Sequence, residues 1–135
     1  MVHNYQIRVR YSDTDQMKRL HHAAYVEYLE VVRIEMLRDI GYSYAILEQS
    51  GYLLPVIKLN VEYLGPTVFD DVIEFKTELR ALSAIRLEFE SLLTTEKNTV
   101  AKARVELVCL DAHSGKPKRL PESMLIHLHS LSKDD

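Results

Sequence analysis

The spacing of apolar residues is strand-like at the start of the chain, becomes helical, and then returns to a strand-like pattern. Residues 5–11 alternate apolar and polar side chains, which predicts a strand with one buried face. Residues 22–40 place apolar side chains three or four positions apart with charged residues between them, which predicts one long amphipathic helix. Gly41 stands where helices favour a left-handed final residue, and residues 43–49 allow a further short helical turn.

The chain after Gly51 is rich in strand patterns that are separated by turn sequences. Residues 84–93 alternate most cleanly, which indicates a sheet with one buried face. A last short element is expected over residues 120–131, where His127 and His129 alternate like strand neighbours. The predicted strands cover residues 53–64, 72–82, 84–95 and 99–110.

This order of elements predicts an α+β fold. An antiparallel sheet of about five strands can bury its apolar face on the single long helix. The length of 135 residues suits one domain, residues 1–135, and is too short for two ordinary ones. One helix cannot cover all of these strands, so exposed sheet edges are expected, and a homo-oligomer would cover them.

Composition narrows the function classes. The net charge of -3 and the scattered Lys and Arg residues argue against nucleic-acid binding. The single Cys109 has no disulfide partner and is interpreted as a small core residue. The start of the chain lacks a signal-peptide pattern, and no stretch approaches the ~18 apolar residues of a membrane span. We therefore expect a cytoplasmic protein with no integral membrane segment.

Two carboxylates and two histidines lie between the first strand and the long helix. Asp13 and Asp15 fall in the connecting loop, and His21 and His22 stand where the helix begins. A helix start presents unpaired N–H groups and a positive dipole end, so a nearby carboxylate suits acyl transfer. We assign loop capping to Asp13 and catalysis to Asp15. Adjacent histidines are poorly spaced for one metal ion, and no metal site is predicted.

These residues resemble a known family, the hotdog-fold thioesterases of the 4-hydroxybenzoyl-CoA thioesterase and YbgC-like group. The resemblance covers nearly the whole chain. The motifs that carry it are Arg10-Tyr-Ser-Asp-Thr-Asp-Gln-Met, His21-His-Ala-Ala-Tyr25, Glu30 with Arg33-Ile-Glu35, Pro55-Val, Val61-Glu-Tyr-Leu-Gly-Pro66 with Asp70-Asp71, and Lys116-Pro-Lys-Arg-Leu-Pro121. The family implies a long central helix wrapped by the sheet, subunits that join their sheets, and thioester sites at the subunit interface.

The resemblance also implies roles for individual residues. Asp15 is implied as the nucleophile or as the general base on water, and the backbone N–H of His22 as the donor to the thioester oxyanion. The His22 side chain is a second candidate for orienting water or substrate. His21 and Tyr25 are expected as substrate contacts. A thiolate, with a pKa of about 8.5, leaves without obligatory protonation, so neither a Ser-His-Asp relay nor a cofactor is needed.

One position departs from the family pattern, because Lys18, followed by Arg19, stands where relatives usually carry glycine. If the turn requires a positive φ there, the lysine carries about 1 kcal/mol of strain. The two cations alternatively meet an anionic acyl group or a phosphate. Lys18 is therefore expected as a substrate contact, and Lys58 and Arg86 are expected as contacts for a CoA phosphate.

The sequence thus predicts an acyl-CoA thioesterase that acts as a homodimer or homotetramer, with CoA as part of the substrate. Two alternatives remain open. A thioesterase acting on acyl carrier protein needs a cationic rim for an acidic carrier. A non-catalytic acyl-CoA-binding module keeps the cleft while Lys18 and Arg19 have closed the chemistry, and it would bind thioesters without turnover.

Overall fold

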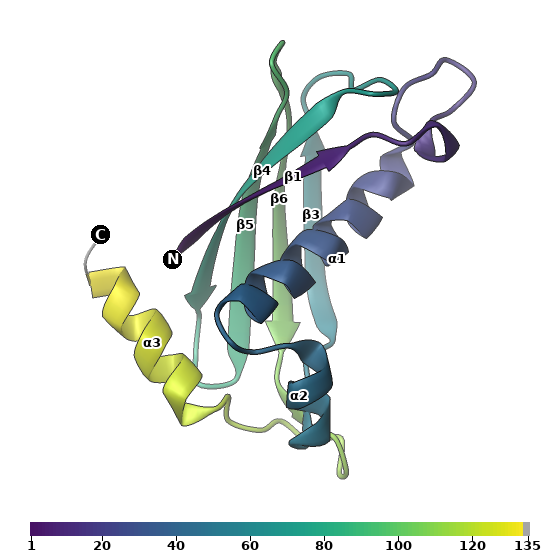
Figure 1. Cartoon of the computed structure of the whole chain (residues 1–135). Helices are drawn as coiled ribbons and strands as arrows, with labels where there is room; N and C mark the ends of the chain where they lie inside the picture. Colours follow the sequence, from purple (N-terminus) through teal and green to yellow (C-terminus); the bar gives the residue numbers. More distant parts are fainter. Residues whose placement is uncertain (134–135) are drawn as a thin grey trace.

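A computed structural model describes the backbone of residues 1–133 and the side chains of residues 1–128. Five antiparallel strands form one sheet in the order β1-β4-β5-β6-β3, and α1 lies across one face of it (Figure 1). The predicted α+β class is confirmed. The elements are β1 (Val2–Arg8), a 3-10 turn η1 (Tyr11–Asp13), α1 (His22–Asp39), α2 (Tyr44–Gln49), β2 (Tyr52–Leu53), β3 (Val56–Tyr63), β4 (Val72–Ala81), β5 (Arg86–Thr94), β6 (Thr99–Val108), β7 (Leu110–Asp111) and α3 (Glu122–Lys133).

The apolar stripe of α1 packs on the apolar face of the sheet. Its buried residues recur at helical spacing, as Tyr25, Leu29, Val32 and Met36 do. The facing sheet residues alternate along their strands and include Ile73, Phe75, Leu79, Leu87, Phe89, Leu93, Val105 and Leu107. Cys109 is also fully buried, which confirms its interpretation as a core residue.

The ends of α1 follow from local chemistry. The ring Nδ1 of His21 accepts a hydrogen bond from the N–H of Ala23 at 3.2 Å and so caps the helix start. At the other end Gly41 has a φ of +92°, which a residue with a Cβ adopts only with strain. The helix therefore begins and ends close to the predicted residues.

Two strand boundaries differ from the prediction. The first strand begins at Val2 and ends at Arg8, because the chain turns at η1 and leaves Tyr11 67% exposed. The segment 53–64 splits at Pro55, which has no N–H to donate to a sheet. The short β2 then pairs with β7, whereas β3 pairs with β6.

The last element is a helix, so the strand-like reading of its histidines is wrong. In α3, Met124 and Leu128 lie one helical turn apart and are both buried, and the element packs against β4. His127 is exposed, and the side chain of His129 lies outside the described residues. Among the described helices, none has the length and apolar content to cross a membrane.

The edge strand β3 is the least covered part of the sheet. It pairs with β6 on one side only, and its apolar residues Ile57, Leu59 and Tyr63 are 51%, 43% and 48% exposed. Together they form an exposed apolar row beside α1. The expectation that one helix leaves sheet edges uncovered is confirmed.

Candidate active site

Asp15 closes a tight turn at the end of the molecule where α1 begins. Its Oδ1 accepts hydrogen bonds from the N–H groups of Met17 at 2.8 Å and Arg19 at 3.2 Å. The backbone N–H of Asp15 donates to the carbonyl oxygen of Arg19 at 2.8 Å. Within the described part of the chain, Oδ2 of Asp15 has no hydrogen-bond partner, and the residue is exposed. The turn therefore orients the carboxylate and leaves one oxygen open to solvent.

Lys18 occupies the turn position at which a positive φ would strain any residue other than glycine. Its φ is 64°, in the left-handed region that favours glycine. The loop therefore keeps a glycine-like path in spite of the lysine, and the predicted backbone strain is present.

We expect Lys18→Gly to raise the free energy of unfolding by about 1 kcal/mol, because glycine adopts this φ without steric cost. Urea unfolding of the two proteins measures the difference. Lys97→Gly is the matched control, since Lys97 is an exposed turn residue without a positive φ, and it should destabilise the protein slightly. A loss of stability in Lys18→Gly would show that the lysine is not strained.

Asp13 ties the loop to the helix through its side chain and its backbone. Its carboxylate accepts hydrogen bonds from Nε of Arg10 at 3.0 Å and from the hydroxyl of Tyr28 at 2.6 Å. Its carbonyl oxygen accepts from the N–H of His21 at 2.9 Å. The Arg10 hydrogen bond, followed by that of Tyr28, lowers the pKa of Asp13. The assignment of loop capping to Asp13 is therefore wrong, since Asp15 caps the turn and Asp13 forms an ion pair.

The lowered pKa of Asp13 predicts a pH-dependent stability. Because the folded-state pKa lies below the unfolded value of about 3.9, the ionised carboxylate stabilises the fold above that pH. This contribution is lost as the pH falls through the folded-state pKa. Asp13→Asn should therefore lower the free energy of unfolding by about 2 kcal/mol at neutral pH, and by less in acid. Urea unfolding of both proteins at neutral pH and at acidic pH tests this. A difference in the free energy of unfolding that does not change with pH would contradict the prediction.

The first residues of α1 present a backbone donor beside the Asp15 turn. Thr14 and Leu20 pair across the base of this loop, which brings its two ends together. The rings of His21 and His22 stack with centroids 4.4 Å apart. The N–H of His22 lies in the first turn, where no intrahelical acceptor exists, and the described residues supply none. This N–H is therefore free to bind an oxygen, with the positive end of the helix dipole behind it.

Two residues that the sequence did not single out fix the wall of the site. The hydroxyl of Tyr63 donates to the carbonyl oxygen of His22 at 2.9 Å, and its ring packs edge-on against that of Tyr25 at 5.0 Å. Tyr25 is 4% exposed and donates to Oγ1 of Thr67 at 3.1 Å. Burial raises the pKa of the Tyr25 hydroxyl. Tyr63 lies in one of the family motifs but was assigned no role from the sequence, and no sequence pattern marked Thr67.

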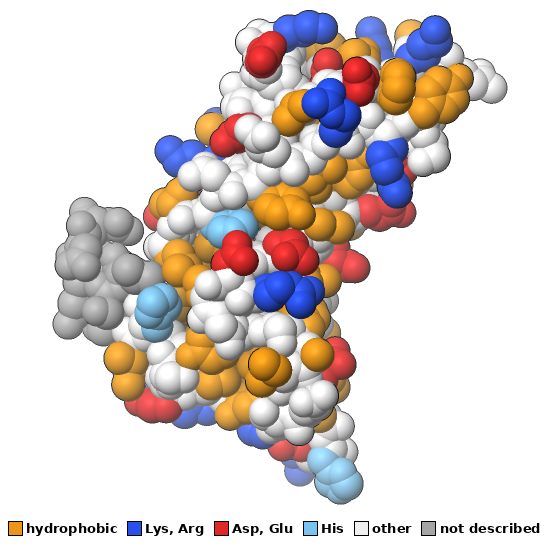
Figure 2. Space-filling model, in the orientation of Figure 1, with side chains coloured by type: hydrophobic (Ala, Val, Ile, Leu, Met, Phe, Trp, Pro, Cys, Tyr) orange, Lys and Arg blue, Asp and Glu red, His pale blue; other side chains and the backbone are white. Residues whose placement is uncertain are grey.

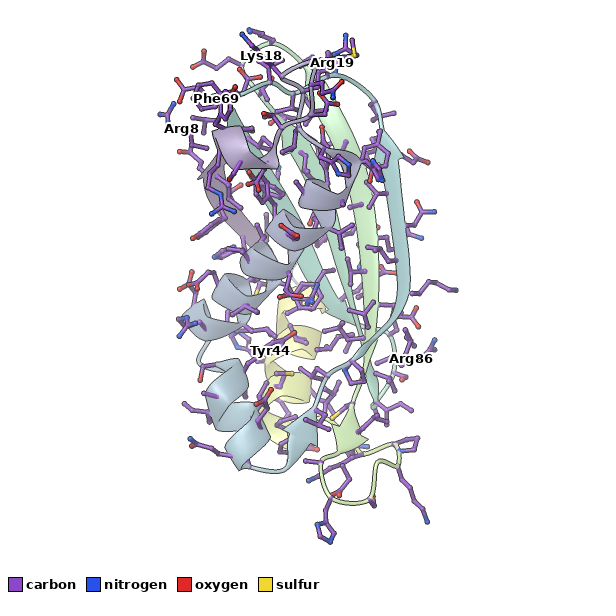
Figure 3. The ribbon with its side chains drawn as sticks, turned by 90° about the vertical axis from the view of Figure 1, so that its right-hand side faces the viewer. Arg8, Lys18, Arg19, Tyr44, Phe69 and Arg86 are labelled. Atoms are coloured by element: carbon purple, nitrogen blue, oxygen red, sulfur yellow. The ribbon has the colours of Figure 1, made fainter. Side chains whose placement is uncertain are left out.

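The predicted site residues fall into two groups. Asp15, Lys18, His21, His22 and Tyr25 lie on the loop and the first turns of α1. Arg86 lies far from Lys18 along the molecule (Figure 3), and its guanidinium pairs with Glu106 at 3.3 Å.

Lys58 is aligned with the same Glu106 in the sheet. Within one protomer, therefore, the structure does not bring Lys58 or Arg86 to Asp15. Among the described residues, no group of three or more His, Cys, Asp or Glu is arranged to hold a metal ion.

Comparisons with known proteins agree on one family. A family profile described as Thioesterase-like superfamily matches residues 9–128. The Acyl-CoA thioester hydrolase YbgC of Escherichia coli O6:H1 is 36% identical over 88% of this chain and 90% of its own length. A DHNA-CoA thioesterase from Staphylococcus aureus superimposes with a TM-score of 0.88 at 27% identity, covering 98% of this chain and 91% of that one. A second Staphylococcus aureus protein, solved in complex with CoA, has a TM-score of 0.91 over 100% of this chain and 86% of its own, but at 19% identity it shows the fold alone.

Proposed function

Because this chain belongs to the thioesterase-like superfamily, has the hotdog fold and is a thioester hydrolase, we propose that it hydrolyses acyl-CoA at Asp15 and the start of α1. The observation that carries this proposal is that an exposed carboxylate and a helix N–H without a partner among the described residues belong to the same loop and helix start. Oδ1 of Asp15 is held by two backbone N–H groups, and the N–H of His22 is unpartnered among the described residues. An oriented carboxylate and an oxyanion donor are the two groups that thioester hydrolysis requires.

The reaction follows from these two groups. Asp15 acts either as general base on water or as nucleophile on the thioester carbon. In the first route, the carboxylate takes a proton from water as the water oxygen attacks the thioester carbon. In the second route, the carboxylate attacks that carbon and the C–S bond breaks to give an anhydride, which water then hydrolyses to the free acid and the carboxylate of Asp15. In both routes the carbonyl oxygen gains negative charge, which the N–H of His22 and the helix dipole stabilise. The thiolate of CoA then leaves, and its low basicity removes the need for a further acid.

The neighbouring side chains would bind the substrate. The exposed ring of Tyr63, packed against the buried ring of Tyr25, offers an aromatic surface beside the proposed oxyanion donor, against which the acyl group would lie. The stacked rings of His21 and His22 are exposed at the same helix start, where they would orient water or the thioester. Lys18 stands in the Asp15 turn, where it would meet an anionic part of the substrate. No cofactor enters this scheme, because CoA is part of the substrate, and we place the enzyme in the cytoplasm with it.

We further propose that a second copy of the chain pairs along β3. An uncovered edge strand with exposed apolar residues favours pairing with another strand. A two-fold axis pairs a strand with itself in the antiparallel direction, so the Val56 end of one β3 lies beside the Tyr63 end of the other. The Val56 end of the partner subunit's β3 would then lie beside Tyr63 and His22, whereas Lys58 lies with Asn60 and Glu62 on the sheet face away from α1. This arrangement places the partner subunit's β3 beside the proposed site, in a homodimer or in a tetramer built from it.

Thiol release from short-chain, long-chain and aromatic acyl-CoAs tests the proposed function. We expect saturable turnover with at least one of these substrates and free CoA as the product. Saturable binding without turnover would instead favour the non-catalytic acyl-CoA-binding module. Turnover only with acyl carrier protein as the thioester donor would favour the carrier-specific thioesterase.

A further inference from the structure

One end of the molecule carries an exposed cluster of apolar and cationic side chains, of which the proposed reaction uses only Lys18, as a substrate contact. We call it the loop tip and define it as Tyr11, Met17, Lys18, Arg19 and Phe69. Tyr11 is 67% exposed, Met17 is 69% exposed and Phe69 is 45% exposed. In Figure 2 hydrophobic side chains lie beside Lys and Arg side chains, with Asp and Glu side chains among them, at the upper end of the molecule, where the loop before α1 projects in Figure 1.

The loop tip is held in place by backbone hydrogen bonds between two loops. The N–H of Phe69 donates to the carbonyl oxygen of Lys18 at 3.1 Å, and Arg19 pairs with Val68. The rings of Tyr11 and Phe69 pack edge-on with centroids 5.4 Å apart. The exposed apolar groups are therefore presented by a fixed backbone, so little conformational entropy is lost when a partner covers them.

The charges of the loop tip are only partly neutralised. Arg8 and Arg10, which lie beside it, pair with Asp70 at 3.3 Å and Asp13 at 3.0 Å. Within the described part of the chain, Lys18 and Arg19 form no salt bridge, and both are exposed. Arg8, Lys18, Arg19 and Phe69 lie together at one end of the molecule in Figure 3.

Asp15 is the exposed acid of the same turn, and its Oδ1 is engaged by the turn's own N–H groups. The Asp15 carboxylate offsets one of the two cations, which leaves one net positive charge in this turn to meet an external anion.

We propose that the loop tip binds an anionic lipid surface. Aromatic and apolar side chains flanked by Lys and Arg are typical of segments that lie in a membrane interface. The apolar groups would enter the headgroup region while Lys18 and Arg19 meet lipid phosphates. A folded protein partner is less well matched, because a specific protein interface takes about 20–30 residues a side, and the loop tip is a small projecting surface.

The position of the loop tip fits this role. The tip continues from β1 and precedes β4, at the sheet edge opposite to β3. Tyr11 and Phe69 therefore lie next to the edge formed by β1 and β4, whereas the start of α1 contacts β3 through Tyr63. Membrane binding does not depend on the proposed function, but if both hold, the Asp15 turn lies at the interface where long-chain acyl thioesters partition.

Flotation of the full chain with vesicles tests the proposal. We expect binding to vesicles of phosphatidylcholine with phosphatidylglycerol, weaker binding to phosphatidylcholine alone, and a loss of binding as the salt concentration rises. A double variant with Tyr11→Ser and Phe69→Ser should bind the anionic vesicles about tenfold more weakly. Ile126→Ser is the matched control, because Ile126 is 61% exposed on α3, and it should bind as the wild type does.

Thermal unfolding by circular dichroism verifies that both variants are folded. Equal binding of the double variant and the wild type would overturn the proposal, as would an absence of vesicle binding by the wild type. Binding of an acidic acyl carrier protein, lost in the double variant and without any vesicle binding, would assign the loop tip to a protein partner instead. Because flotation has no activity readout, its result is independent of whether acyl-CoA is hydrolysed.

Discussion

Asp15→Asn should lower kcat for acyl-CoA hydrolysis by about 10²–10⁴-fold, with KM changed much less. An amide neither accepts a proton from water nor attacks a thioester. The asparagine Oδ1 can still accept the hydrogen bonds from Met17 and Arg19, so the turn and the binding surface stay in place. Steady-state thiol release measures kcat and KM for both proteins.

Asp111 offers a matched control for this substitution. Oδ1 of Asp111 likewise caps a turn, since it accepts from the N–H groups of His113 and Ser114 at 2.8 Å each. Asp111→Asn should leave kcat near the wild-type value. Full activity in Asp15→Asn, or an equal loss in both variants, would remove Asp15 from the reaction.

Leu59→Glu should raise the dissociation constant of the dimer by at least about 100-fold. Leu59 lies near the middle of β3 and is 43% exposed, so a two-fold axis there would bring two new carboxylates close together. The separated subunits should also lose most of their turnover, because Tyr63 of the proposed site lies on the β3 edge that the partner subunit covers. Sedimentation velocity and thiol release on the same samples measure both effects.

Leu92→Glu is the control for the dimer prediction. Leu92 is 37% exposed in the middle of the sheet on β5, away from the β3 edge. It should leave the dissociation constant and the turnover unchanged. A Leu59→Glu protein that remains dimeric would place the subunit contact elsewhere, and a monomer with full activity would show that one protomer forms the whole site.

Sequence spacing predicted α1 well because its apolar period matches only a helix. The same reasoning failed for α3, whose apolar residues Met124, Ile126 and Leu128 fit both alternation and helical spacing. Packing decides between the two, since Met124 and Leu128 are buried while Ile126 is 61% exposed. The end of β1 was also missed, because alternation continues to Tyr11 although the chain has already turned.

The site could be predicted in part for similar reasons. The family motif assigned Asp15 and His22 to one site. The positive φ of Lys18 follows from a turn that favours glycine. The partners of the two carboxylates were not predictable, because Arg10 and Tyr28 reach Asp13 only once β1 and α1 are packed. Lys58 and Arg86 were grouped with the site by charge alone, whereas sheet register sets where they lie.

The most direct test of the account observes the proposed oxyanion donor itself. Protein labelled with ¹⁵N-histidine would be titrated with a CoA ketone analogue, in which a methylene group separates the sulfur from the carbonyl and prevents hydrolysis. The account predicts a large, saturable downfield shift of the His22 amide proton, while the amide of His3 on β1 stays unchanged. Saturable binding of the analogue with an unshifted His22 amide would contradict the placement of the thioester oxygen at the start of α1.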